Sequence, residues 1–160
     1  MKVKMIIIHC SDSEWGTASE IKKWHTQPPP KGRGWSRLGY HFVICNGYPT
    51  YISYKDKKFD KKYLGALEIG SPENVSGIHC EGDNSQSIGI CLIGDKTFPE
   101  ESKITLYTLL GCLLVKYDLN VSDIYGHCER PSGIRQGKTC PNLDMDQLRK
   151  ELIVYLANQS

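Results

Sequence analysis

The sequence predicts an α/β fold, a single domain with a central mixed β-sheet of about five to six strands flanked by helices. Short β-branched apolar runs alternate with segments of helical periodicity, an order that places helices on the faces of a sheet. An Asn-Gly pair after one of these runs indicates an antiparallel return, so the sheet should be mixed. The chain has 160 residues, enough for one hydrophobic core, and it shows no internal repeat or clear linker. We therefore expect residues 1–160 to form one domain.

The N-terminal elements are predicted to be a buried strand and a helix. Residues 3–8 are almost continuously apolar and β-branched, which is typical of a strand buried on both faces. Thr17 followed by Glu20 has the form of a capping box, so a helix should begin near Ala18. That helix must end before the prolines at 28–30, because proline disfavours helical backbone at the residue before it.

A hairpin is predicted after the proline-rich loop. Residues 39–45 are rich in aromatic and β-branched side chains and predict a strand. Asn46-Gly47 is the strongest short signal for a hairpin turn, so we expect residues 51–53 to return antiparallel to that strand.

The second half of the chain is predicted to hold two strands and two helices. Residues 87–94 and 124–127 have the composition of buried strands. Between them, apolar side chains at helical spacing predict a long helix over residues 99–117, namely Ile104, Tyr107, Leu110, Leu114 and Tyr117. Asp144 is placed to cap a last helix, whose apolar side chains would be Leu148, Leu152, Tyr155 and Leu156.

Charge and hydropathy exclude a membrane-spanning helix and give only weak evidence of binding to an anionic polymer. The formal net charge of +2 is weak, and the one basic cluster, at residues 55–62, is interrupted by Asp56 and Asp60. A solvated face is the simpler interpretation of this cluster, and a patch for an anionic polymer is the alternative. The longest apolar runs are far shorter than the ~20 residues that a membrane span needs. Residues 1–5 lead directly into the first strand, so no signal peptide is evident, although a removed leader stays open.

The seven cysteines fit a disulfide framework poorly, because their number is odd. Cys45, Cys91 and Cys112 lie within apolar runs, where a free thiol behaves as a small hydrophobic side chain. We expect most of the cysteines to be reduced and buried.

Two histidines and one cysteine have the character of metal ligands. His9 and His127 fall at the ends of predicted strands, and Cys140 lies in the loop before the last helix. In open α/β sheets, ligand-binding sites lie at the ends of strands and in the loops beside them. Two imidazoles and a thiolate would leave one position of a tetrahedral Zn²⁺ free for water, as in catalytic zinc sites. The sequence therefore predicts one Zn²⁺ ion in a hydrolytic site.

Two further side chains are suited to assist such a site. The hydroxyl of Tyr40 could hydrogen-bond a water or a substrate oxygen, and the ammonium of Lys138 could stabilise a developing oxyanion. Hydrolysis of an amide is the reaction that this set of groups fits.

The order of several short motifs resembles that of zinc N-acetylmuramoyl-L-alanine amidases, of the type that includes phage lysozyme-like amidases and peptidoglycan recognition proteins. The resemblance extends over nearly the whole chain and depends on residues 8–11 (IHCS), 39–42 (GYHF), 77–85 (GIHCEGDNS), 87–90 (SIGI), 126–127 (GH) and 138–141 (KTCP). It implies a peptidoglycan substrate and cleavage of the amide between N-acetylmuramic acid and L-alanine. It also implies an endolysin-like, antimicrobial role in degrading the cell wall.

The resemblance assigns roles to individual residues. It makes His9, His127 and Cys140 the zinc ligands and Tyr40 and Lys138 the catalytic pair. It also places His79 beside the substrate. The neighbouring His41 is expected to point away from the metal, because adjacent residues in a strand face opposite sides.

Two loops depart from the compact phage form and could shape the substrate groove. Residues 131–137 lengthen the segment between His127 and Cys140. Residues 28–35 form a proline-rich loop, from which Trp35 and the nearby Arg37 could contact glycan or stem peptide.

Other functions stay open at this level. A peptidoglycan-binding or partner-inhibiting protein could be built on the same fold with little catalysis. A cysteine-nucleophile peptidase would use Cys10 or Cys140. A nucleobase deaminase would need a downstream P-C-x-x-C pair, whereas here Cys140 precedes Pro141 and no second cysteine follows. With no evident leader, an amidase of this kind would be made in the cytoplasm and would act on the wall after release or export.

Overall fold

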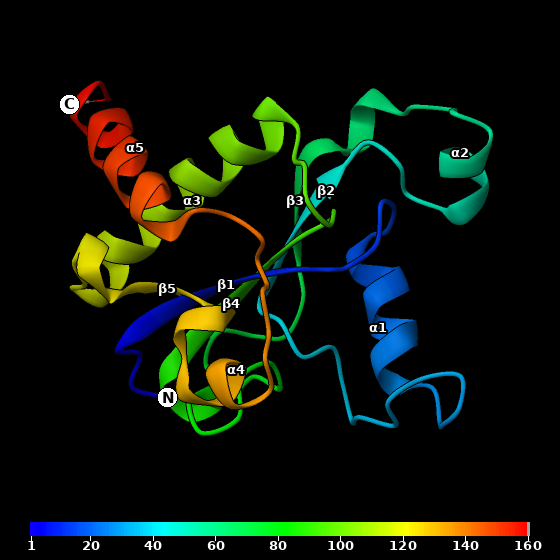
Figure 1. The fold of residues 1–160 in the computed structure, drawn as a ribbon, viewed down its shortest axis with the longest axis horizontal. Helices are drawn as coiled ribbons and strands as arrows, with labels where there is room; N and C mark the ends of the chain where they lie inside the picture. Colours follow the sequence, from blue (N-terminus) through cyan, green and yellow to red (C-terminus); the bar gives the residue numbers. More distant parts are fainter. Residues whose placement is uncertain (160) are drawn as a thin grey trace.

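The computed structural model describes residues 1–159 and has an α/β architecture around one five-stranded sheet (Figure 1). The strands are β1 (Met5–Cys10), β2 (Phe42–Asn46), β3 (Leu64–Ile69), β4 (Ser87–Leu92) and β5 (Ile124–Gly126), in the order β3-β2-β4-β1-β5. β1 is parallel to β4 and β5, β2 is parallel to β4, and only β3 runs antiparallel to its neighbour β2. The prediction of a mixed sheet is confirmed.

Helices cover both faces of this sheet. α3 (Glu100–Tyr117) and α5 (Met145–Ala157) lie on one face, and α1 (Ala18–Thr26) lies on the other (Figure 1). The shorter helices α2 (Tyr51–Lys55) and α4 (Pro131–Arg135) belong to connections between elements. No helix within residues 1–159 is long and apolar enough to cross a membrane.

The predicted helix starts are confirmed by their caps. The side chain of Thr17 accepts a hydrogen bond from the backbone N–H of Glu20 at the start of α1, and that of Asp144 accepts one from Gln147 at the start of α5. Each cap satisfies a backbone donor that the first helical turn leaves without a partner.

The larger part of the core lies between the sheet and the helices α3 and α5. Alternate β1 side chains, Ile6, Ile8 and Cys10, point into it. α3 contributes Leu106, Tyr107, Leu109, Leu110, Leu113 and Leu114. Ile104, which we expected on this buried stripe, is 46% exposed, because the contact face of α3 is centred on Leu106 and Leu110 instead.

The hairpin prediction was wrong in its second strand. Residues 51–53 belong to α2, where Thr50 and Ser53 form a reciprocal capping box that favours a helical turn. Tyr51 and Ile52 are exposed there, so no sheet partner stabilises an extended backbone. The antiparallel partner of β2 is β3, which comes later and which the sequence did not reveal because its alternation is weak.

Candidate active site

The sheet directs His9 toward the face covered by α1. Its neighbours Ile8 and Cys10 point into the core on the opposite face, and successive side chains of a strand alternate. His9 pairs in register with Cys91 of β4, which packs in the smaller core beneath α1. The strand pattern therefore brings a histidine to the floor of the space beside α1.

Three buried side chains from distant parts of the sequence converge there. One ligand atom from each of His9, His127 and Cys140 lies within 4.8 Å of the other two. The three side chains are 1%, 9% and 9% exposed, respectively. His9 is the second-last residue of β1, His127 follows β5 directly, and Cys140 lies between α4 and α5. Adjacent parallel strands therefore bring the two histidines together.

The surroundings of these three residues suit a cation bound by nitrogen and sulfur. Nε2 of His127 is buried and has no hydrogen-bond partner among residues 1–159, an unusual state for a buried polar atom. Sγ of Cys140 accepts a hydrogen bond of 3.0 Å from the backbone N–H of Cys10, which is suited to a thiolate. Burial lowers the pKa of His9 well below its ordinary value, so its imidazole is neutral, as a metal ligand must be. The residues present fit a Zn²⁺ ion.

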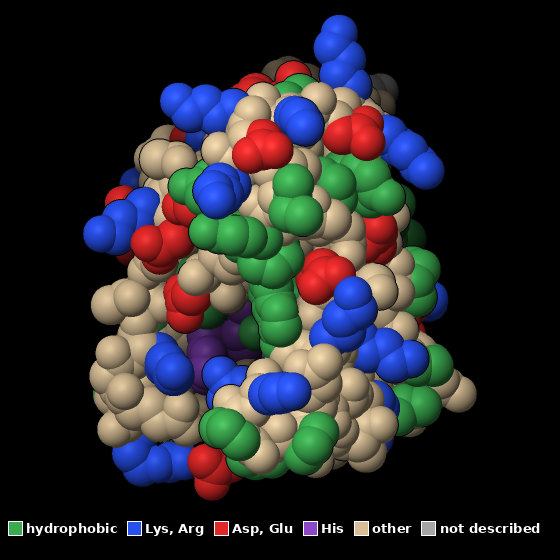
Figure 2. Space-filling model, turned by 90° about the vertical axis from the view of Figure 1, so that its right-hand side faces the viewer, with side chains coloured by type: hydrophobic (Ala, Val, Ile, Leu, Met, Phe, Trp, Pro, Cys, Tyr) green, Lys and Arg blue, Asp and Glu red, His purple; other side chains and the backbone are tan. Residues whose placement is uncertain are grey.

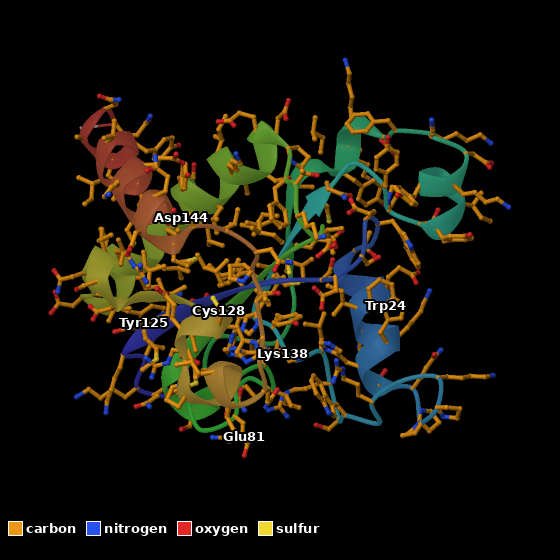
Figure 3. The ribbon with its side chains drawn as sticks, viewed as in Figure 1. Trp24, Glu81, Tyr125, Cys128, Lys138 and Asp144 are labelled. Atoms are coloured by element: carbon orange, nitrogen blue, oxygen red, sulfur yellow. The ribbon has the colours of Figure 1, made fainter. Side chains whose placement is uncertain are left out.

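A cavity of about 480 Å³ opens over this cluster. Figure 2 shows it as a hollow with histidine side chains inside it. Six side chains that the sequence singled out border it together with Cys140, namely His9, Trp35, Tyr40, His79, His127 and Lys138. Lys138 comes from the loop after α4, and Trp24 comes from α1 on the other side of the hollow (Figure 3).

Arg37 and His41 are not part of the cavity lining. The guanidinium of Arg37 donates to the backbone carbonyl of Ser76, so it braces a loop and does not face the cavity. Nδ1 of His41 accepts a hydrogen bond from the backbone N–H of Gly89, and its Nε2 donates to the carbonyl of Val75. Both nitrogens of His41 are thus used within the fold.

Tyr40 lies directly beside the cluster of ligand candidates. Its ring centroid is 5.0 Å from that of His9 and 6.3 Å from that of His79. Burial, followed by the nearby Cys91 and Cys140, raises the pKa of Tyr40 well above its ordinary value. Its hydroxyl therefore stays protonated at neutral pH and can serve as a hydrogen-bond donor.

His79 is held against His9 by the packing of its loop. Nε2 of His9 and Nδ1 of His79 are 3.0 Å apart and share a hydrogen bond. The side-chain oxygen of Asn84 accepts hydrogen bonds from the backbone N–H groups of His79 and Cys80, at 2.8 and 2.9 Å. A Cβ atom on Gly89 would lie 2.7 Å from the His79 ring, so a glycine is required where the ring crosses β4.

A partly buried ion pair joins this loop to the segment after β5. Nε and an Nη of Arg130 donate to the carboxylate of Asp83 at 2.9 and 3.2 Å. Burial alone would raise the pKa of Asp83, but the hydrogen bonds and charge of Arg130 lower it overall. The guanidinium also lies 4.6 Å from the ring centroid of Tyr125. The pair fixes the two sides of the cavity that carry His79 and His127 relative to each other.

His25 is a cavity residue that the sequence did not single out. Its ring lies 4.5 Å from Trp35 and 5.4 Å from Tyr40, between centroids, and its Nδ1 accepts a hydrogen bond from the backbone N–H of Gly39. Burial, with a smaller contribution from Arg33, lowers its pKa from 6.5 to about 4. Its position near the end of a short amphipathic helix gave no signal that separates it from an ordinary helical histidine.

This lowered pKa predicts a pH dependence of stability. The unfolded chain binds a proton at His25 near pH 6.5 and the folded chain only near pH 4, so unfolding takes up a proton in this window. The contribution of His25 to the free energy of unfolding should be complete above pH 6.5 and should fall by about 3 kcal/mol as the pH decreases to 4. Urea titrations with chelator present give the free energy of unfolding of the native chain and of His25→Gln at each pH. As the pH decreases over this range, that free energy should fall more steeply for the native chain than for the variant. Parallel curves would contradict the burial of a neutral imidazole.

Comparisons with known proteins agree with this arrangement. Residues 1–143 match the family model described as N-acetylmuramoyl-L-alanine amidase. The endolysins of Enterobacteria phage T3 and Escherichia phage T7 are each 32% identical to the chain over 151 residues, covering 88% of this chain and 81% of the relative.

Solved structures give the same result for the fold. The amidase LysC from Clostridium intestinale URNW superposes with a TM-score of 0.72 at 25% identity, covering 95% of this chain and 86% of that one. Wild-type Drosophila PGRP-LB, at 23% identity, shares the fold with a TM-score of 0.61 over 87% of this chain and 74% of its own. With its matched sequence, its mixed sheet and its histidine-lined cavity, the chain belongs to the N-acetylmuramoyl-L-alanine amidase family.

Proposed function

We propose that this peptidoglycan amidase is a zinc enzyme whose single Zn²⁺ ion is held by His9, His127 and Cys140. The observation that carries the proposal is the convergence of three buried ligand atoms within 4.8 Å at the floor of the cavity. The substrate bond is the amide between N-acetylmuramic acid and L-alanine. A bound zinc ion would supply Lewis-acid activation of water and of the substrate carbonyl.

The chain's own residues would complete the site around the substrate carbonyl. The protonated hydroxyl of Tyr40 donates a hydrogen bond toward the reacting oxygen. The ammonium of Lys138, at the rim, stabilises the negative charge that develops on that oxygen. His79 keeps His9 oriented through their shared hydrogen bond and borders the bound substrate. Trp35 forms part of the wall.

The site supports a metal mechanism better than a thiol nucleophile. Contact with Cys140, followed by burial, raises the pKa of Cys10, which opposes formation of a thiolate there. Cys140 points its sulfur at the two histidines and the backbone of Cys10, as a ligand would.

Digestion of purified peptidoglycan tests the proposal directly. Native, chelated and zinc-restored protein would be compared for new L-alanine amino termini and for new reducing sugar ends. Zinc-dependent release of alanine termini alone is the expected result. Activity that resists chelation but is lost on alkylation of thiols would mean that hydrolysis uses a cysteine nucleophile and not a zinc ion. Zinc binding without release from any wall type would indicate a binding or inhibitory protein on this fold.

Lys138→Met should lower kcat by roughly 10- to 100-fold with the metal retained. The effect is smaller than that of losing a buried oxyanion donor, because Lys138 is exposed and water can partly replace it. Steady-state hydrolysis of a muramyl peptide checks the rate, and zinc analysis checks the metal. Lys96→Met, on an exposed loop outside the cavity lining, is the matched control. An unchanged kcat would remove Lys138 from the mechanism.

We further propose that residues 1–160 act as one amidase domain and that it works on the cell wall after release or export.

A further inference from the structure

A row of aromatic rings leads out of the cavity and is not used by the site described above. Trp24 lines the cavity. The ring centroid of Trp15 lies 5.1 Å from that of Trp24, and that of Tyr51 lies 5.9 Å from Trp15. We call Trp24, Trp15 and Tyr51 the aromatic row. Figure 2 shows hydrophobic side chains running along this face beside the histidine-containing hollow.

The rings of the row are accessible along its length. Tyr51 is 55% exposed, and Trp15 and Trp24 are half-buried. They come from three separate segments: α1, the loop after β1, and α2 in the β2–β3 connection. Large aromatic rings that are ordered and open to water are typical of ligand-binding surfaces.

The loop that carries Trp15 is held in place by hydrogen bonds that do not involve the tryptophan side chain. The backbone N–H of Gly94 donates to the hydroxyl of Ser11 at 3.1 Å, and the hydroxyl of Ser13 donates to the carbonyl of Trp15 at 2.8 Å. The side-chain amide of Asn46 donates to the carbonyl of Glu14 at 2.9 Å. A pre-ordered loop loses little conformational entropy when a ligand binds to it.

Tyr51 is likewise presented by a locally braced element. Thr50 and Ser53 cap α2 reciprocally, at 3.0 and 3.1 Å. Behind it, the ring of Tyr48 packs edge-on against Tyr54 and Phe59, with centroids 5.6 Å apart in each pair. The exposed ring of Tyr51 therefore stands on a fixed support, although the helix beneath it has only five residues.

We infer that the aromatic row is a carbohydrate-binding platform for the glycan strand of the polymeric substrate, on one side of the muramyl residue that is cleaved. Pyranose rings present apolar C–H faces that stack on aromatic rings, while their hydroxyls stay in water or meet polar groups at the edge. Asp12, an exposed carboxylate that borders the cavity and lies in the same loop as Trp15, supplies such a group. Because Trp24 belongs both to the aromatic row and to the substrate cavity, we expect the row to bind another part of the same substrate.

This inference rests on the proposed amidase function and deepens it. A platform outside the cavity contributes binding only when the substrate has sugars beyond the cleaved residue. It therefore predicts that the enzyme prefers intact glycan strands to single muramyl peptides.

Two substrates separate this effect from damage to the active site. For Trp15→Ala and Tyr51→Ala, kcat/KM on uncrosslinked polymeric strands should fall about tenfold, mainly through KM. On a single N-acetylmuramoyl peptide it should stay within twofold of the native value. Ile69→Ala, at a 67% exposed position outside the row and its support, is the matched control. Equal losses on both substrates would mean that the rings only shape the site, and no loss on either would likewise overturn the platform.

A binding experiment gives a readout that does not depend on turnover. Titration with β-1,4-linked N-acetylglucosamine oligomers should shift the indole N–H resonance of Trp15, and Tyr51→Ala should weaken this binding severalfold. Saturation by the free stem peptide or by anionic vesicles, with no response to the oligosaccharide, would assign the row to another ligand and overturn the inference. If the native chain binds the oligosaccharide but hydrolyses no wall, the proposed catalytic function fails while the platform stands.

Discussion

Cys140→Ala is expected to abolish both zinc retention and amide hydrolysis. Cys140 is the only thiol of the proposed ligand set, and its loss would leave two imidazoles, too few to hold a structured zinc site at ordinary metal concentrations. The same result is expected for His127→Ala, because it also removes one of the three proposed ligands, whose ring centroid lies 4.7 Å from that of His9. Metal content after gel filtration and release of alanine termini measure the two effects separately. Activity should fall to background, a loss of at least about 10³-fold.

Cys112→Ala provides the matched control. Cys112 is exposed on α3 and is not part of the cavity lining, so this variant should keep both metal and activity. Circular dichroism would confirm that the ligand variants are folded, since Cys140 also accepts the N–H of Cys10. A folded Cys140→Ala protein with native zinc content and native turnover would refute the ligand assignment.

Tyr40→Phe should retain zinc and lose most turnover. The ring packs beside His9 and His79, so its removal would open a cavity, but phenylalanine keeps the packing and removes only the hydroxyl. Loss of one preorganised donor to a developing oxyanion typically lowers kcat by about 10²- to 10³-fold. KM should change little, because the hydrogen bond is strongest in the transition state.

The pH dependence of kcat tests the role of the Tyr40 hydroxyl further. Burial raises the pKa of Tyr40, so its hydroxyl should remain a donor throughout the neutral and mildly alkaline range. No loss of rate attributable to Tyr40 should appear up to pH ~10, where a free tyrosine would already be half ionised. Tyr54→Phe, 40% exposed on α2, is the control and should behave as the native protein does. Native kcat in Tyr40→Phe would exclude the hydroxyl from the reaction.

Elements whose signals are local could be predicted closely from the sequence. The strand predicted at residues 3–8 overlaps β1, which begins and ends two residues later, at Met5–Cys10. Thr17 and Asp144 cap the helices that their side chains predict, because a cap depends only on the next three residues. The helix over 99–117 was predicted within one residue, and Tyr107, Leu110 and Leu114 of its predicted stripe are buried. Ile104 is exposed, because the buried face of a helix is set by what packs against it.

The β2–β3 connection shows where local signals fail. Residues 51–53 favour strand by composition, yet nothing lies beside them to accept their hydrogen bonds, and the Thr50 cap turns them into a helix. β3 pairs with β2 instead, in a register that skips between Ile44 and Asn46. Pairing across such a distance depends on the path of the intervening loop, which no short window of sequence contains.

The candidate site, like the fold, could be predicted from the sequence only in part. By itself, the sequence determined the chemical types available. These are two histidines at strand ends, a thiol in the loop before the last helix, a tyrosine and a lysine, together with a motif order that identified the family. Only the tertiary structure decided which side chains share a space. It turned Arg37 toward Ser76 and brought His25, Asn84 and the aromatic row to the cavity or its edge. The physical reason is that residue identity fixes what a group can do, whereas strand register, face alternation and loop path fix what it can reach.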